Sequence, residues 1–153
     1  MNETIFADST PSDEEYAACI GNNVHFYLPK FRRYALTPTN FHGGWNWPAF
    51  FFGCWWFLYR KMYFWALIAF ITLCIPYFQL LFMIGWGVAA NHLYFRHVNS
   101  RMDELRGVQG RAFMQCLYES GGVHGWVPWV AFFVSGGFVL MILLGVVSLA
   151  LLI

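Results

Sequence analysis

Charged residues are scarce in this sequence. Asp, Glu, Lys and Arg make up 11% of the 153 residues, whereas hydrophobic residues make up 59%. A soluble domain carries roughly 25% charged and about 45–50% apolar residues. The formal net charge is only +1, so the strong basic field of a nucleic-acid-binding domain is missing. The composition therefore excludes an ordinary soluble core and a nucleic-acid partner, and it predicts one membrane domain with a small polar head.

Charge is absent altogether from one long continuous run. No Asp, Glu, Lys or Arg occurs between Met62 and Phe95. An apolar run of more than about 18 residues is typical of a helix that crosses a lipid bilayer. The start of the chain is polar and acidic up to Glu15 and lacks the basic and then apolar pattern of a cleaved signal peptide. We therefore expect an integral membrane protein.

Recognisable catalytic motifs are missing too. The sequence contains no phosphate-binding loop, dinucleotide fingerprint, nucleophile elbow or zinc-protease motif. The predicted membrane spans hold no carboxylate, the usual mark of a pump or proton relay. The cysteines have no paired spacing, so we expect free thiols rather than a disulfide or a zinc site; they are Cys19, Cys54, Cys74 and Cys116. We predict a protein that is not an enzyme and holds no cofactor or metal.

The polar head, residues 1–44, is predicted to form two short cytoplasmic helices. Ser12 has the capping-box spacing to an acidic residue, which predicts a helix over Asp13–Ile20. A second helix over Val24–Tyr34 alternates aromatic and basic residues. Two interpretations of this second helix remain open: it lies on anionic lipid headgroups, or it belongs to a small head packed on the membrane domain.

An aromatic block follows and has no polar face between Trp47 and Tyr59. As a helix it would extend only about 20 Å, less than the roughly 30 Å hydrocarbon core. Continuing it through Arg60 and Lys61 would leave two cations at mid-membrane, at a cost of about 5–7 kcal/mol. We therefore predict a half-inserted, re-entrant helix that begins near Pro48, with both cations extending to the surface from which it entered.

The uncharged run from Met62 to Phe95 would form a straight helix of about 51 Å, longer than one crossing needs. We predict a transmembrane hairpin with crossings at Lys61–Ile75 and Tyr77–Phe95, so that residues 45–97 form the re-entrant helix and the hairpin. A single Pro-kinked helix is the alternative. Basic residues at both ends of the hairpin place the head and the 98–120 linker in the cytoplasm.

The C-terminal part, residues 121–153, is again free of charge. We predict one crossing over Pro128–Leu151, with a hairpin broken at Gly136-Gly137 as the alternative. The linker before it is expected to be a solvated connector with some helix around Ser100–Arg106. A stripe of small residues in the last crossing would let a neighbouring helix approach closely; it consists of Ala131, Ser135, Gly137 and Gly145.

Polar side chains cluster at the cytoplasmic end of the second predicted crossing, namely Asn91, His92, Tyr94 and His97. Asn91 and Tyr94 are three residues apart and share a helix face, and His97 continues that face. Too few of them are metal ligands to make a metal site. We therefore predict hydrogen bonding between helices and interfacial anchoring.

The central motif resembles a known family. The string Asn46-Trp47-Pro48-Ala49-Phe50-Phe51-Phe52-Gly53 with Trp56-Phe57-Leu58-Tyr59-Arg60-Lys61-Met62-Tyr63 is similar to the signature of a bacterial inner-membrane family catalogued as domain of unknown function 2628. Flanking residues from Tyr16 to Phe31 and from Asn91 to His97 are similar to its pattern. The resemblance implies a small inner-membrane protein without an established activity, and the structural or interaction residues Asn46, Trp47, Phe51, Gly53, Trp56, Tyr59, Arg60, Lys61, Tyr63, Asn91, Tyr94 and His97.

Two functional hypotheses follow from the sequence. The first is an all-α, multi-pass inner-membrane protein that acts as a non-catalytic accessory or interaction subunit, with membrane lipids and a protein partner or a second copy as its contacts. The alternative is a lipid-handling or small-solute transport or channel protein, in which the re-entrant aromatic block lines a path through the membrane.

Overall fold

The computed structural model describes residues 11–107 and 111–152, and every regular element within these ranges is a helix. In chain order they are α1 (Asp13–Ile20), α2 (Val24–Ala35), α3 (Trp47–Phe52), α4 (Cys54–Tyr59), α5 (Tyr63–Leu73), the short 3₁₀ helix η1 (Pro76–Phe78), α6 (Gln79–Leu105), α7 (Arg111–Ser120) and α8 (Val127–Leu152). The predicted all-α class is confirmed. The first ten residues of the predicted head lie outside the described residues.

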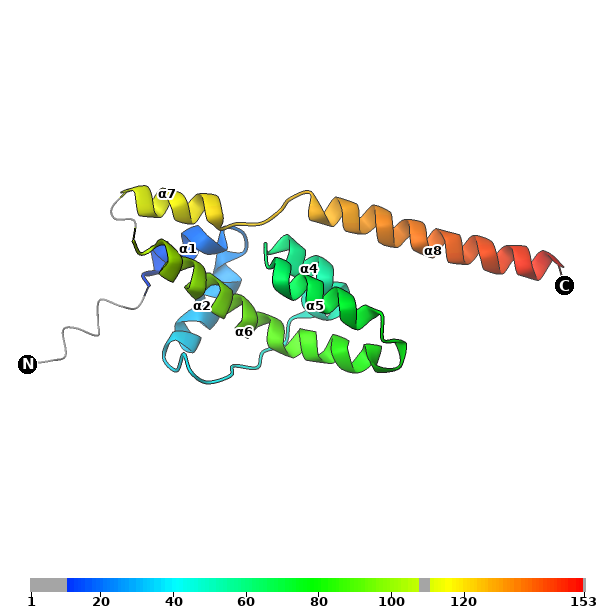
Figure 1. Ribbon diagram of the computed structural model, residues 1–153, viewed down its shortest axis with the longest axis horizontal. Helices are drawn as coiled ribbons and strands as arrows, with labels where there is room; N and C mark the ends of the chain where they lie inside the picture. The colour runs from blue at the N-terminus through cyan, green and yellow to red at the C-terminus, as the bar shows by residue number, and fades with distance from the viewer. Residues whose placement is uncertain (1–10, 108–110, 153) are drawn as a thin grey trace, which may run out of the picture.

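The head is a small helical layer packed on the end of α6. Helix α1 begins with the predicted capping box, in which Ser12 and Glu15 bond each other's backbone N–H groups. Helices α1, α2 and α7 all pack against α6 (Figure 1). The core between them is built from aromatic rings, with Phe31 fully buried against Tyr94 and Phe95 at 5.5 and 5.3 Å between ring centroids. This packing favours the interpretation of α2 as part of a small head.

The aromatic block forms two short helices instead of the single predicted one. Asn46 caps α3 by accepting a hydrogen bond from the Ala49 N–H, and Pro48 lies in the first turn. Gly53 then adopts a φ of 40°, which breaks the helix before α4 begins. Helix α3 packs on α6 and α4 packs on α5. The block therefore lies against neighbouring helices.

Helices α5 and α6 form a hairpin that turns at η1 (Figure 1). The indole N–H of Trp86 in α6 donates to the Thr72 hydroxyl in α5 over 3.1 Å, and Trp65 packs against the same Trp86. The predicted turn near Pro76 is thus correct, and the alternative of one kinked helix is wrong. Helix α5 has only 11 residues, so its length is about 16 Å, roughly half of a bilayer core.

The predicted linker is largely helical. Helix α6 continues without a break to Leu105, and α7 packs on α1 and α6. These residues belong to the head and do not form a loose connector. Helix α8 continues through Gly136 and Gly137, so the predicted C-terminal hairpin alternative is also wrong. Over Val127–Ser148, α8 is long and apolar enough to cross a membrane.

Two glycine-rich helix ends meet where α1 and α7 stop. The N–H of Gly122 donates to the carbonyl of Cys19 over 3.0 Å. A Cβ atom at Gly121 would lie 2.6 Å from that carbonyl oxygen and 2.7 Å from the Cα of Cys19. A Cβ atom at Gly21 would lie 2.8 Å from the Cα of Gly122. Only glycine allows the two helix ends to approach this closely.

We expect Gly121→Ala to destabilise the head, because the added methyl group would collide with the α1 backbone. The free energy of unfolding should fall by about 1–3 kcal/mol, the usual cost of forcing extra atoms into a packed site. Gly125→Ala is the matched control, since a Cβ atom there meets nothing within 4 Å. Thermal unfolding in mild detergent measures both variants. Equal midpoints for the two variants would contradict the close approach.

Candidate functional site

A polar region surrounds the buried Arg60 and the partly buried Lys61, where α4 ends. The N–H of Met62 donates to the Phe57 carbonyl and the N–H of Lys61 donates to the Leu58 carbonyl, which is the Schellman pattern of a helix end. Lys61 occupies the left-handed position of this motif with a φ of 60°, where glycine is usual and other residues cost about 1–2 kcal/mol. The turn directs the two neighbouring side chains to two different helix ends.

Arg60 reaches the end of α1. Its side chain donates to the carbonyls of Ile20 and Asn22, both over 3.3 Å, and to the Tyr94 hydroxyl over 3.1 Å. The guanidinium also lies over the rings of Tyr27 and Tyr94, at 4.5 and 4.8 Å from their centroids. Arg60 is only 2% exposed, so the prediction that it extends to the surface is wrong. The head covers it because the carbonyls at a helix end carry a partial negative charge that attracts a cation.

Lys61 reaches the end of α7. Its ammonium group donates to the carbonyls of Glu119, Ser120 and Gly121. Glu119 and Ser120 are the last residues of α7, whose carbonyls have no partner within the helix, and Gly121 follows them. The two cations that were expected to meet solvent and lipid headgroups therefore each close the C-terminal end of a helix.

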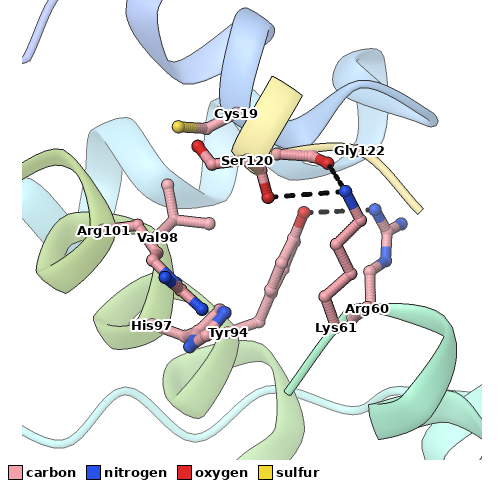
Figure 2. A pocket seen from close by; sticks show the side chains of 10 residues that line it. Cys19, Arg60, Lys61, Tyr94, His97, Val98, Arg101, Ser120 and Gly122 are labelled. Carbon is pink, nitrogen blue, oxygen red and sulfur yellow. Dashed lines mark hydrogen bonds between the residues drawn. The ribbon is translucent and has the colours of Figure 1, made fainter. Parts of the chain in front are cut away.

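A small cavity lies between these two contacts, with a volume of about 20 Å³, close to the size of one water molecule (Figure 2). Tyr94, His97 and Arg101 extend into it from α6, opposite Arg60 and Lys61. Burial, aided by the charge of Arg101, lowers the pKa of His97, although Glu104 opposes the shift. The neutral form of His97 is therefore favoured. The pKa of the Cys19 thiol, which lines the same cavity, is raised to about 11 by burial, so this cysteine is protonated.

A second polar network lies between the start of α3 and α6. The side-chain amide of Asn46 donates to the carbonyl oxygen of the Asn91 side chain over 2.9 Å. Asn91 in turn donates to the backbone carbonyls of Gly44 and Trp45, over 3.0 and 3.3 Å. Both asparagines are at most 2% exposed. The hydrogen bonding predicted for the polar cluster on α6 is seen at Asn91 in this network and at Tyr94 with Arg60, whereas the predicted interfacial anchoring stays a prediction. The network anchors α3 to α6.

The remaining predicted residues have different surroundings. Trp56 is buried in the ring core, and the Tyr59 hydroxyl accepts from the Asn22 side chain over 3.1 Å. Tyr63 bonds His124 over 2.5 Å. Trp47 and Phe51 are 60% and 62% exposed, so they lie on the outside of the aromatic block. The structure thus brings together Arg60, Lys61, Tyr94 and His97, separates Asn46 and Asn91 into a second network, and leaves the exposed rings outside both.

Sequence reasoning missed several contributors to the site. Tyr27 stacks on Arg60, but its position in α2 gave no sign of that contact. The backbone carbonyls at the ends of α1 and α7 carry no sequence signal of their own. The usable signal was the pair of helix-ending glycine sites at Gly21 and Gly121-Gly122, which marks two C-terminal ends in need of partners.

The described residues contain no group of three or more His, Cys, Asp or Glu side chains able to hold a metal ion. Cys19 and Cys54 are buried, Cys74 is exposed and Cys116 is partly buried. Comparison with protein families, curated proteins and solved structures gives no match for this chain. The resemblance to family 2628 therefore remains a prediction.

We expect Arg60→Met to unfold the head more easily. The substitution keeps much of the side-chain volume but leaves the carbonyls of Ile20 and Asn22 and the Tyr94 hydroxyl without this donor. An unsatisfied buried polar group costs about 1–3 kcal/mol, so the free energy of unfolding should fall by about 3 kcal/mol. The control is Arg33→Met, because Arg33 is exposed and should change by less than about 0.5 kcal/mol. Denaturant titration in mild detergent, monitored by circular dichroism, measures the free energy of unfolding of both variants. Equal losses in the two variants would contradict the prediction.

Proposed function

We propose that this chain is a small integral protein of the bacterial inner membrane that acts as a non-catalytic accessory or interaction subunit. The observation that carries the proposal is the exposed apolar surface of α8. Only 6% of the apolar stretch within Val127–Ser148 is buried within the fold. Side chains such as Phe132 and Met141 are 70% and 74% exposed. Soluble monomers rarely expose an apolar patch larger than a few hundred Å².

Helix lengths support a membrane placement with one full crossing. The apolar part of α8 has 22 residues, or about 33 Å, which matches the hydrocarbon core. The α5–α6 hairpin extends from the head in the same direction as α8 and ends before it does (Figure 1). We infer that the hairpin enters one leaflet and turns back at η1, while α8 crosses. The head and α7 then remain on the cytoplasmic side and the C-terminus lies on the other side.

The far part of α8 favours a protein contact. Within the fold α8 packs on α4, near its own start. Cβ atoms added at Gly137 or Gly145 would meet nothing within 4 Å, so these positions are open to a neighbouring helix. Small residues at such positions let a second helix approach closely, so that van der Waals packing holds the pair together in lipid.

We expect a protein partner or a second copy of the chain to co-purify in mild detergent. Replacing both small residues, Gly137→Ile with Gly145→Ile, should remove that association because the added side chains separate the helices. The matched control is Leu140→Ile with Leu143→Ile, which changes shape at two branched positions of the same helix. Cross-linking in membranes, sizing and mass spectrometry give the composition. A monomer free of co-purifying protein in the unmodified chain would refute the proposal.

A lipid-handling or transport role is the second candidate, and a groove between α4 and α8 favours it. The groove has a volume of about 630 Å³ and is lined by rings from the aromatic block, among them Trp55 and Trp56, with Arg60 and Asn23 at its polar part. Ligand sites commonly have about 300–1,000 Å³ and mostly apolar walls. In reconstituted vesicles this role predicts lipid scrambling or solute flux that Gly136→Phe, placed in the groove wall, reduces. Rates equal to those of empty vesicles would remove this candidate.

A further inference from the structure

A second open cleft lies between the start of α5 and the middle of α6. Its volume is about 420 Å³. One wall begins at Lys61 and continues through the first residues of α5, and the other belongs to α6. The residues that line it are Lys61, Met62, Tyr63, Phe64, Trp65, Leu93, Arg96, His97, Ser100 and Arg101. The cleft shares Lys61, His97 and Arg101 with the water-sized cavity described above.

The cleft has a positive charge without an acidic lining residue. Lys61, Arg96 and Arg101 contribute three cations, and no Asp or Glu is among the lining residues. The bonds of Lys61 go to neutral carbonyls, so they leave its full charge in place. Arg101 lies 3.5 Å from Glu104, and both side chains are largely exposed, at 45% and 63%. Such a surface pair is weak, so an anionic ligand can compete for Arg101.

The other half of the cleft is apolar. Phe64 is 68% exposed, and Trp65 and Leu93 line the cleft together with it. Leu93, Arg96 and Ser100 follow at spacings of three and four residues on α6, so they share one face. Along α6, Arg96 and Arg101 lie nearer the end that packs on the head, and Leu93 lies nearer the turn of the hairpin at η1. The cleft therefore changes from basic to apolar in the direction in which a lipid changes from headgroup to acyl chain.

We propose that this cleft binds one anionic phospholipid. The phosphate lies between Arg96 and Arg101 with Lys61 beside it, and an acyl chain lies along Phe64, Trp65 and Leu93. Basic pockets between helices on the cytoplasmic side are suited to anionic headgroups, because each nearby cation adds attraction to the phosphate. A soluble phosphate compound would leave the exposed rings uncovered, so the apolar wall favours a lipid. The inference rests on the proposed membrane location.

The test measures the lipids retained by the purified chain. The protein is reconstituted into bilayers with equal amounts of phosphatidylglycerol and phosphatidylcholine, extracted in mild detergent at 0.15 M salt, and analysed by native mass spectrometry. We expect one phosphatidylglycerol molecule bound in preference to phosphatidylcholine. Arg101→Gln should lower this preference about fivefold, the effect of one interfacial cation. Arg96→Gln combined with Arg101→Gln should lower it further.

Arg106→Gln is the matched control. Arg106, like Arg101, lies near the end of α6 and pairs with an acidic residue three positions away; its side chain is 47% exposed, against 45% for Arg101. It does not line the cleft, so its loss should leave the lipid preference unchanged. Ser100→Trp tests the location of the site. The added ring fills the cleft while every cation stays in place, so this variant should no longer retain the lipid. Circular dichroism verifies that each variant is folded.

Three outcomes would overturn the lipid site. An equal loss of preference in Arg106→Gln and Arg101→Gln would show a general surface charge effect. Unchanged retention in Ser100→Trp would place the lipid elsewhere. Displacement of the lipid by millimolar glycerol 3-phosphate would assign the cleft to a soluble phosphate compound. Release of the whole chain from membranes by alkaline carbonate would instead refute the membrane location, so the two failures are distinguishable.

Discussion

The arrangement of the helices depends on how two adjacent cations are hydrogen-bonded at the end of α4. Arg60 bonds the end of α1, and Lys61 bonds the end of α7. Each bond pairs a full positive charge with the partial negative charge of a helix C-terminus, equivalent to about half an elementary charge. The head is therefore joined to the α5–α6 hairpin through two helix ends, which also meet each other at Gly121 and Gly122.

Local patterns in the sequence predicted much of the fold. The capping box gave the start of α1, and the Pro76 region gave the turn of the hairpin. The positions of Asn91 and Tyr94 on one face predicted their bonds between helices. These features depend on residues close together in the chain, where periodicity and turn chemistry act directly.

One error concerns a contact between distant parts of the chain, and two concern where helices begin and end. Arg60 was expected at the surface because the free-energy cost of placing its charge in the hydrocarbon core was compared only with that of placing it in water. The structure instead supplies carbonyls from residues about 40 positions earlier. The kink at Gly53 was missed because rings on both sides give an uninterrupted apolar pattern, and only the φ of 40° reveals two helices. The extent of α6 was underestimated because its charged end continues helical beyond the apolar run.

The short length of α5 has a consequence for the bilayer itself. In the membrane placement proposed above, the leaflet next to the head would accommodate α5, the apolar half of α6 and α8, whereas the opposite leaflet would accommodate α8 alone. The protein then has a wedge-shaped cross-section, wider on the side of the head. Many such wedges in one patch would expand the monolayer on the side of the head relative to the other and make the membrane convex on that side.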